Sequence, residues 1–242
     1  MKKFGLVGGQ LGHSYSKTFF TTYFEEYDIK ATYENFAVPT VEGLQDVLNS
    51  GIDGCNVTIP YKETIIPFLD GLSPEAEAIG AVNCVQVIEG KKIGHNTDAF
   101  GFQQSIKPFL TNRHERAAIF GTGGASKAVE YVLKQLGIDV IFISRTPKGE
   151  NQFDYSNVNE HLLRACKLLV NTTPVGMYPN VEDSLAIPYE FLTSEHLVVD
   201  LIYNPSVTKT LDNARAAGAQ ILNGETMLKQ QALKSWDIWS GK

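Results

Sequence analysis

The segment Asn56-Val57-Thr58-Ile59-Pro60-Tyr61-Lys62 carries side chains that could do chemistry. Its β-branched residues predict a short strand, which Pro60 ends because proline cannot donate a hydrogen bond to a neighbouring strand. Lys62 then stands where the backbone leaves the sheet. If a helix begins there, its dipole disfavours a cation in the first turn. An amide, a hydroxyl and a lysine at a strand end therefore indicate a site rather than a purely structural segment.

Further polar groups precede predicted helices. Thr97 or Asp98, in Asn96-Thr97-Asp98, is expected to cap the helix that follows, which by itself explains this triplet. One of Ser14 and Ser16 is likewise expected to cap a helix over 16–27. A helix N-terminus with free hydroxyl groups can also bind a carboxylate, so a binding role stays open for these serines.

Gly121-Thr122-Gly123-Gly124-Ala125-Ser126 lies between a predicted strand and a predicted helix. This context favours a dinucleotide-binding turn, in which glycines allow the backbone to approach a pyrophosphate at the helix N-terminus. Ser126 stands where the fingerprint usually has Gly or Ala, and glycine clusters also occur in ordinary turns. The flanking elements make the binding interpretation the better one.

The next strand ends in Ser144-Arg145-Thr146. An NAD site usually has an acidic residue at this point, to bind the ribose 2′-hydroxyl. An arginine suits the 2′-phosphate of NADP, although arginines in solvent after a strand are common. The segment favours NADP over NAD.

Strand-like and helix-like patterns alternate along the chain, which predicts an α/β fold with mostly parallel sheets. Strands are expected over 4–7, 32–37, 55–59, 82–88, 91–94, 117–120, 140–143, 168–170, 197–200 and 220–222. Helices are expected over 16–27, 41–48, 126–136, 208–217 and 225–239, with another starting at Ser73-Pro74-Glu75. The strands around Glu89-Gly90 are expected to form a hairpin. A domain boundary is expected near residue 100.

The composition is that of an ordinary globular protein of 242 residues, 43% hydrophobic and 20% charged. A net charge of −6 disfavours nucleic acid or an anionic membrane as the main partner. Three cysteines without a C-x-x-C pair indicate a reducing, cytoplasmic setting. The five histidines lack metal-ligand spacing, so no metal is expected.

Taken in order along nearly the whole chain, these segments resemble the shikimate dehydrogenase family. The resemblance rests on the motifs His13-Ser14-Tyr15-Ser16, Asn56 to Lys62, Gly80-Ala81-Val82-Asn83, Asn96-Thr97-Asp98, the glycine turn, Ser144-Arg145-Thr146, Asn171-Thr172-Thr173-Pro174-Val175-Gly176-Met177, Asp200-Leu201-Ile202-Tyr203-Asn204-Pro205, Asn223-Gly224 and Gln231. It implies a two-domain enzyme that reduces 3-dehydroshikimate to shikimate with NADPH.

The resemblance also implies roles for individual residues. Lys62 and Asp98 would form the catalytic pair, and Ser14, Ser16 and Tyr203 would hold the substrate carboxylate. The substrate ring hydroxyls would contact Thr58, Asn83, Asp98 and Gln231. NADP(H) would contact Gly121, Thr122, Gly123, Gly124, Ala125, Ser144, Arg145, Thr146, Leu201 and Gly224.

The substrate domain would span 1–100 and be completed by a C-terminal helix over 224–242, and the Rossmann-like NADP domain would span 101–223. Hydride addition to a ketone puts negative charge on its oxygen, which an ammonium group can stabilise and protonate. Whether Lys62 or a bound water transfers the proton stays open. The protein is expected to be a monomer or homodimer.

Several positions depart from the family pattern. Lys17 replaces the usual Pro after the second serine, and Ser144 replaces the usual Asn before Arg145. Residues 148–158 are too few for the helix that normally follows, so the nucleotide domain is expected to be trimmed. Two alternatives are a quinate/shikimate dehydrogenase that uses NAD and a non-catalytic NADP-binding regulatory protein. The retained Ser14, Ser16 and Arg145 favour the NADP-dependent shikimate enzyme over the first alternative. The second is disfavoured because the chain keeps Lys62, Asp98, Asn83 and Gln231 together.

Overall fold

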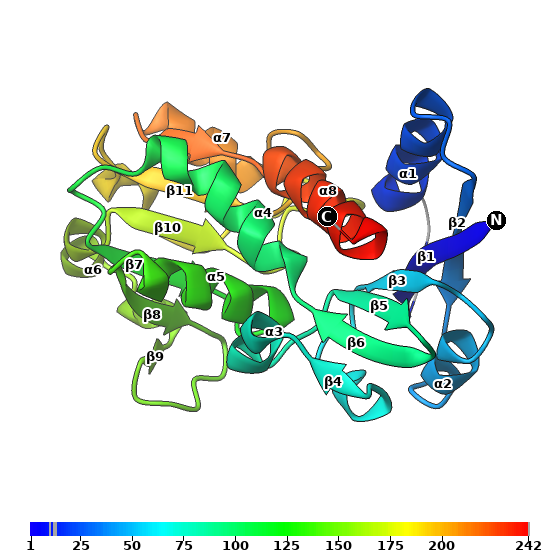
Figure 1. Cartoon of the computed structure of the whole chain (residues 1–242). Coiled ribbons are helices and arrows are strands. Elements are labelled where there is room, and N and C mark those ends of the chain that lie inside the picture. The colour runs from blue at the N-terminus through cyan, green and yellow to red at the C-terminus, as the bar shows by residue number, and fades with distance from the viewer. Residues whose placement is uncertain (10, 12–13, 242) are drawn as a thin grey trace. The chain divides into compact units, whose positions relative to one another are not determined.

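The computed structural model describes residues 1–9, 11 and 14–241, and the protein has the expected α/β fold with mostly parallel sheets (Figure 1). His13 of the serine motif is outside the described residues. The chain divides into two compact units. Unit 1 comprises Met1–Phe100 and Gln231–Lys242, and unit 2 comprises Gly101–Gln230.

Unit 1 is built on a six-stranded sheet of order β2-β1-β3-β5-β6-β4. Its strands are β1 (Lys2–Gly8), β2 (Ala31–Ala37), β3 (Gly54–Val57), β4 (Gly71–Leu72), β5 (Cys84–Ile88) and β6 (Lys91–His95). Strands β2, β1 and β3 are parallel, whereas β5 is antiparallel to both β3 and β6. The expected hairpin is confirmed: Glu89 and Gly90 join β5 to β6 with φ angles of 51° and 78°, as a type I′ turn requires.

The helices of unit 1 cover both faces of this sheet. They are α1 (Tyr15–Glu26), α2 (Gly43–Leu48), η1 (Ile66–Phe68) and α3 (Pro74–Ile79), together with the last part of α8 (Glu225–Ser240). One face carries an aromatic core in which Phe4 stacks on Trp239 at 4.6 Å between ring centroids. The Trp239 indole donates to the Val85 carbonyl (2.9 Å), and a Cβ at Gly54 would be 2.5 Å from its Nε1. The missing side chain of Gly54 thus lets the C-terminal helix pack directly on β3.

Unit 2 is built on a second six-stranded sheet, of order β12-β11-β10-β7-β8-β9, in which every neighbouring pair is parallel. Its strands are β7 (Arg116–Phe120), β8 (Asp139–Ile143), β9 (Gln152–Phe153), β10 (Leu168–Asn171), β11 (Leu197–Asp200) and β12 (Gln220–Leu222). Its helical segments are the later part of α4 (Thr97–Ile106), η2 (Lys107–Phe109), α5 (Gly124–Gln135), η3 (Tyr155–Asn157), α6 (Glu160–Ala165), η4 (Tyr189–Phe191), α7 (Lys209–Ala216) and the first part of α8.

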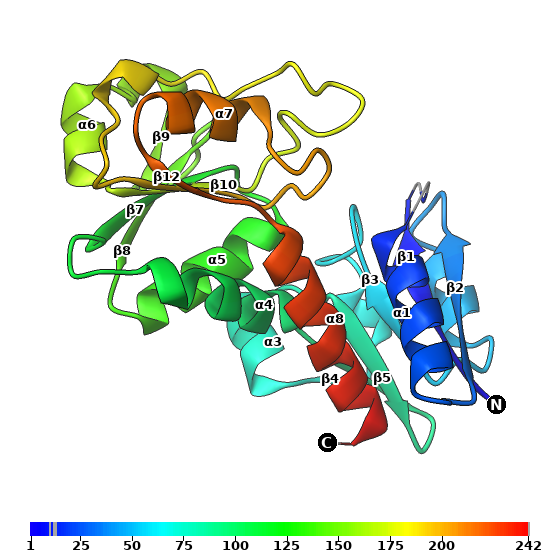
Figure 2. The same cartoon turned by 90° about the horizontal axis from the view of Figure 1, so that it is seen from above.

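Helices α6 and α7 pack on one face of this sheet and α5 on the other (Figure 2). Residues 148–158, expected to be too few for the helix that normally follows, contain β9 and the three-residue 3₁₀ helix η3 but no α-helix. The sheet is therefore doubly wound, and beyond β8 it ends in the two-residue edge strand β9.

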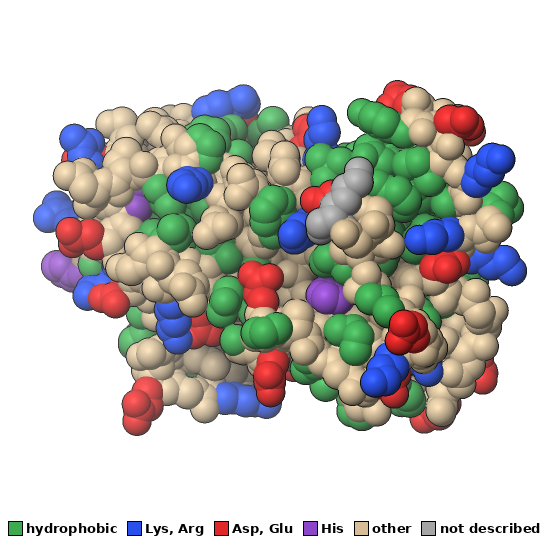
Figure 3. Space-filling model, viewed as in Figure 1, with side chains coloured by type: hydrophobic (Ala, Val, Ile, Leu, Met, Phe, Trp, Pro, Cys, Tyr) green, Lys and Arg blue, Asp and Glu red, His purple; other side chains and the backbone are tan. Residues whose placement is uncertain are grey.

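The surface mixes acidic and basic side chains on the face shown in Figure 3, where hydrophobic side chains gather beside α1. Phe19, Tyr23 and Tyr27 form an aromatic ladder along α1, with successive distances of 5.7 and 4.6 Å between ring centroids. No helix in the described part of the chain is long and apolar enough to cross a bilayer.

Candidate active site

The carboxyl end of β3 leads into a turn that carries Lys62. The sequence left open whether a helix begins at Lys62. No α-helix begins there, and the next helical element, η1, starts at Ile66. The Lys62 carbonyl accepts a hydrogen bond from the Val82 amide (2.7 Å), which fixes this turn beside β5. The Lys62 Nζ atom lies 2.6 Å from Asp98 Oδ2, and the two side chains are only 16% and 5% exposed. The structure thus joins the two residues expected to form a catalytic pair.

Asp98 lies in the first turn of α4, where the helix dipole favours an anion. The expectation that Thr97 or Asp98 caps this helix is wrong. Asn96 takes this role, since its Oδ1 accepts from the Ala99 amide (3.2 Å) and its Nδ2 donates to the Ala81 carbonyl (2.9 Å). Capping by Asn96 leaves the Asp98 carboxylate available to Lys62.

Asn83 precedes β5 and orients Gln231 on α8. Its Oδ1 accepts from the Thr97 amide (2.6 Å), and its Nδ2 donates to Gln231 Oε1 (2.9 Å) and Thr97 Oγ1 (3.0 Å). Asn83 is 2% exposed and uses its polar atoms within the protein. Because the Gln231 oxygen is engaged, the amide nitrogen of Gln231 is the group suited to bind a ligand acceptor.

A buried network that sequence reasoning missed extends this arrangement. The Tyr33 hydroxyl donates to Asn56 Oδ1 (2.8 Å), and Asn56 Nδ2 donates to Ser235 Oγ (2.9 Å). Burial raises the pKa of Tyr33 well above its ordinary value, so the phenol stays protonated and able to donate. Ser235 lies one helical turn after Gln231 and donates to its carbonyl (2.9 Å). That spacing, on the same helix face, was the signal available in the sequence.

Ser14 and Ser16 lie at the start of α1. Ser14 is the N-cap, as expected of one of the two serines, and its Oγ accepts from the Lys17 amide (3.3 Å). Its hydroxyl hydrogen can still be donated. Ser16 lies close enough to Tyr33 to lower the pKa of that phenol, against the larger effect of burial, which raises it. Lys17, the departure from the family pattern, pairs with Glu34 on β2 (2.6 Å).

Thr58 directly follows β3, and its side chain is partly exposed. Its amide donates to the Val7 carbonyl (2.9 Å), and its carbonyl accepts from the Tyr61 amide (2.9 Å). These bonds place Thr58 at the carboxyl edge of the parallel strands β1 and β3. Lys62, Asp98, Asn83, Gln231, Ser14, Ser16 and Thr58 all belong to unit 1.

In unit 2, the glycine turn follows β7 at the carboxyl edge of the sheet. Gly121 has φ 104°, and a Cβ there would lie 2.7 Å from Thr172 Oγ1, so this position requires glycine. Gly123 is the N-cap of α5, where no side chain caps the helix, and the space around its Cα is open. Ser126 is buried with its hydroxyl bonded to the Gly123 carbonyl (2.6 Å), which accommodates the departure from Gly or Ala. The uncapped amides of α5 and this open turn fit a pyrophosphate.

The next strand, β8, ends beside Ser144, Arg145 and Thr146. Ser144 Oγ accepts from the Thr146 amide (3.2 Å), and Arg145 and Thr146 are exposed. Tyr155, which was not predicted, is close enough to Arg145 for the guanidinium to lower the pKa of its phenol, although burial raises that pKa more. The pairing of β8 with β9 brings Tyr155 to this edge, because the Ser144 amide donates to the Phe153 carbonyl (2.9 Å).

Leu201, Tyr203 and Gly224 occupy loops at the same carboxyl edge, after β11 and β12. The Gly224 amide donates to the Ile202 carbonyl (3.0 Å), and a Cβ on Gly224 would be 2.1 Å from the Leu201 oxygen. Gly224 therefore permits close packing of the two loops. Tyr203, which the resemblance groups with Ser14 and Ser16 around the substrate carboxylate, is in unit 2, whereas the two serines are in unit 1.

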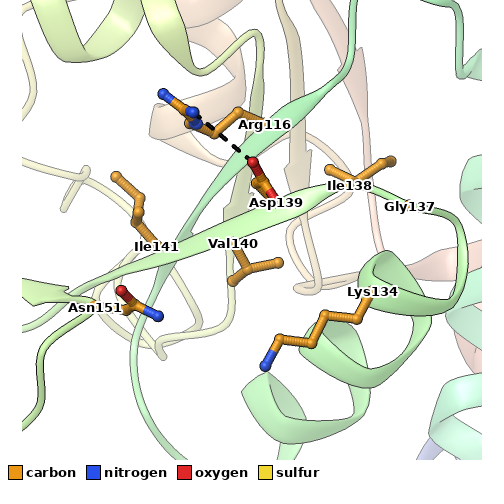
Figure 4. A pocket seen from close by; sticks show the side chains of 8 residues that line it. All are labelled: Arg116, Lys134, Gly137, Ile138, Asp139, Val140, Ile141 and Asn151. Carbon is orange, nitrogen blue, oxygen red and sulfur yellow. Dashed lines mark ion pairs between the residues drawn. The ribbon is translucent and has the colours of Figure 1, made fainter.

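A cavity of about 440 Å³ lies at the opposite, amino ends of β7 and β8 (Figure 4). Arg116 and Asp139 face each other across 3.7 Å at its rim, and Lys134 lines it from α5. Because this cavity is at the far end of the strands from Gly121, it is separate from the residues that fit a dinucleotide.

Comparison with known proteins agrees with this arrangement. Residues 6–85 match the model of the shikimate dehydrogenase substrate binding domain. The shikimate dehydrogenase (NADP(+)) of Chlorobaculum tepidum is 37% identical over 100% of this chain and 91% of its own length.

The chain is also similar to two solved structures, and each alignment covers 100% of this chain and 94% of the other one. The Thermus thermophilus shikimate 5-dehydrogenase, in complex with NADP(H) and shikimate, has 33% identity and a TM-score of 0.88. The Corynebacterium glutamicum quinate dehydrogenase, in complex with NAD, has 27% identity and a TM-score of 0.88. This chain belongs to the shikimate dehydrogenase family.

Proposed function

We propose that this protein catalyses the NADPH-dependent reduction of 3-dehydroshikimate to shikimate, with Lys62 and Asp98 as its catalytic pair. The observation that carries the proposal is the 2.6 Å contact between Lys62 Nζ and Asp98 Oδ2 in a nearly buried setting. The pair lies in unit 1, and Lys62 is within the segment that matches the family's substrate binding domain. The names of the curated relatives support the reaction.

The chemistry follows from the charges of this pair. NADPH, when bound, supplies a hydride to the carbonyl carbon of the ketone. Negative charge then develops on the ketone oxygen, and the Lys62 ammonium stabilises it and donates a proton from Nζ. Asp98 orients Lys62 and keeps a compensating charge beside it. In the reverse direction, Lys62 accepts the hydroxyl proton of shikimate.

Side chains of unit 1 are proposed to orient the substrate. Ser14 and Ser16 would donate hydroxyl hydrogen bonds to its carboxylate, with Tyr203 completing this group. Thr58, Asn83, Asp98 and Gln231 are the proposed contacts of the ring hydroxyls. The Gln231 oxygen is bonded to Asn83, which leaves the amide nitrogen of Gln231 to contact the substrate. Asn83 is bonded to both Thr97 and Gln231, which supports a role for Asn83 in positioning Gln231.

The cofactor is proposed to bind at the carboxyl edge of the unit 2 sheet. Gly121, Thr122, Gly123, Gly124 and Ala125 would hold the pyrophosphate, which the uncapped N-terminus of α5 favours. The 2′-phosphate would be held by Ser144, Arg145 and Thr146, and Leu201 and Gly224 would border the nicotinamide. The substrate domain is proposed to span 1–100 with the C-terminal helix over 224–242, and the NADP domain 101–223, whereas the compact units divide within α8, after Gln230.

The setting proposed for this reaction is the cytoplasm, with the protein a monomer or homodimer. Cys55, Cys84 and Cys166 are free and buried, and burial raises the pKa of each thiol. Unpaired thiols are typical of a reducing compartment.

The decisive test offers shikimate and quinate, each with NADP and with NAD, and follows the absorbance of the reduced cofactor. We expect the highest kcat/KM with shikimate and NADP. A second candidate function, NAD-dependent oxidation of quinate, is supported by the similarity to the Corynebacterium glutamicum quinate dehydrogenase in complex with NAD, at 27% identity and a TM-score of 0.88. Faster reaction with quinate and NAD would select that function, and no reduction in any pairing would refute both.

A further inference from the structure

Asp200, at the end of β11, is a fully buried carboxylate with no cationic partner among the residues that the structure describes. It is 0% exposed. Oδ1 accepts from the Ile202 amide (3.1 Å) and from Asn171 Nδ2 (3.1 Å), and Oδ2 accepts from Thr208 Oγ1 (2.7 Å). Burial raises the pKa of Asp200 to about 6, against the opposing effect of these neutral donors. A buried charge that is not paired costs stability, so its presence calls for a role beyond packing.

The three hydrogen bonds join three separate segments of unit 2. Ile202 belongs to the loop after β11, and Thr208 is the N-cap of α7, where its Oγ1 also accepts from the Leu211 amide (3.3 Å). Asn171 ends β10, and its Oδ1 accepts from both the amide and the hydroxyl of Thr173 (3.0 and 2.6 Å). Asp200 therefore links the loops after β10 and β11 to the start of α7.

The loop after β10 borders the glycine turn directly, and the loop after β11 is joined to that loop. A Cβ on Gly121 would be 2.7 Å from Thr172 Oγ1, and the Thr172 hydroxyl donates to the Phe120 carbonyl (2.7 Å). The Leu201 amide donates to the Asn171 carbonyl (3.0 Å). In a doubly wound sheet, the two halves of a dinucleotide lie over strands on opposite sides of the central turn. Since Arg145 follows β8 on one side, the loops after β10 and β11 border the nicotinamide half.

We propose that Asp200 is a positioning residue that holds these two loops in the arrangement that the nicotinamide half of the cofactor requires. The inference rests on the proposed function, because it assumes that unit 2 binds NADP(H). A carboxylate suits this role because both of its oxygens accept hydrogen bonds. An asparagine or a protonated aspartate presents a donor to Thr208 instead. The Thr208 hydroxyl would then lose its acceptor while still capping α7.

The neighbourhood assigns the pH response to Asp200 itself. Tyr189, on η4, is the described titratable side chain that the Asp200 charge influences: burial raises the pKa of its phenol most, and the Asp200 charge raises it further. The phenol therefore stays neutral in weakly acidic solution. Between about pH 5 and 8, Asp200 is the member of this pair that changes charge.

The experiment compares full-length wild type with Asp200→Asn in binding NADPH and 2′-phospho-ADP-ribose, which lacks only the nicotinamide. We expect Asp200→Asn to weaken NADPH binding roughly 10-fold or more near neutral pH, the value of one hydrogen bond to a charged group. Binding of 2′-phospho-ADP-ribose should be unchanged. The ratio of the two proteins' NADPH dissociation constants should fall toward one below about pH 5, where wild-type Asp200 is protonated too.

The 2′-phosphate of the cofactor also titrates near pH 6, but its effect cancels in the ratio of the two proteins' dissociation constants.

Asp212→Asn is the matched control, because Asp212 is an exposed acid of α7 paired with Arg215 at 2.7 Å. This variant should bind both ligands as wild type does. Equal weakening of both ligands, unchanged NADPH binding or a ratio independent of pH would overturn the inference. If Asp200→Asn does not fold, the wild-type protein alone provides the test. Its dissociation constant for NADPH, divided by that for 2′-phospho-ADP-ribose, should rise as the pH falls through about 6, and a constant quotient would overturn the inference. Wild type that binds no NADPH would instead refute the proposed function.

Discussion

Replacing Lys62 by methionine tests the proposed chemistry with little change in side-chain length. The substitution removes the Nζ atom that lies 2.6 Å from Asp98 Oδ2. A positioned acid contributes about 10²- to 10⁴-fold to a rate, which corresponds to about 3–5 kcal/mol in the activation barrier. We expect kcat to fall by this factor. The dissociation constant of NADPH should stay unchanged, because Lys62 belongs to unit 1 and the glycine turn to unit 2.

The same substitution leaves the Asp98 carboxylate, with only 5% of its side chain exposed, without its cation. Removing one partner of a buried ion pair costs about 3–5 kcal/mol of unfolding free energy. Asp98 keeps its favourable position in the first turn of α4, worth up to about 1 kcal/mol. The unfolding free energy of Lys62→Met should therefore fall by about 3 kcal/mol, the lower end of this range.

The double variant Lys62→Met/Asp98→Asn separates the two effects, because it also removes the unpaired charge. It should recover much of the lost stability but none of the turnover. Rates would be measured with shikimate and NADP, cofactor affinity by NADPH fluorescence, and stability by urea unfolding. Lys134→Met is the matched control, since Lys134 forms an exposed pair with Glu130 at 2.7 Å. Surface pairs of this kind contribute less than about 1 kcal/mol.

Three outcomes would refute the reasoning on Lys62. One is a kcat for Lys62→Met within about tenfold of wild type, less than general acid catalysis contributes. Another is a loss of NADPH affinity as large as the loss of turnover. The third is activity in the double variant, because no proton donor would then remain at this position.

Three further variants test other parts of the molecule. Arg145→Ala should weaken NADP binding about 10- to 100-fold and leave NAD binding unchanged, measured by fluorescence titration, because only NADP has the 2′-phosphate; equal weakening would contradict this. The Asp200 carboxyl has a pKa of about 6 in the folded protein against about 3.9 unfolded, so its contribution to stability is complete below about pH 4 and is lost as pH rises through 6. Urea unfolding should therefore show Asp200→Asn more stable than wild type by up to about 3 kcal/mol above pH 7, with the difference vanishing near pH 4; a constant difference would contradict this. Trp239→Ala should lower the unfolding free energy by about 3–5 kcal/mol, because Trp239 is 5% exposed and stacked on Phe4; a loss below about 1 kcal/mol would argue against its place in the core.

Local patterns were sufficient for the α/β class and the β5–β6 hairpin, and the number of residues in 148–158, set against the family pattern, for the missing α-helix after β8. Each depends on periodicity, turn residues or segment length, which act over a few neighbouring positions. The short elements β4, β9 and α6 were not predicted. Strands of two residues, such as β4 and β9, exist only when neighbouring segments pack against them.

The site divides in the same way. The sequence by itself determined which side chains are present and in what order, and hence the resemblance to a dehydrogenase family. Only the tertiary structure decided that Asn83 binds Gln231 from 148 residues away. It also revealed the unpaired burial of Asp200. Hydrogen bonding and burial at these positions depend on the order of strands in a sheet and the return of a distant helix, which bring together residues that no local pattern relates.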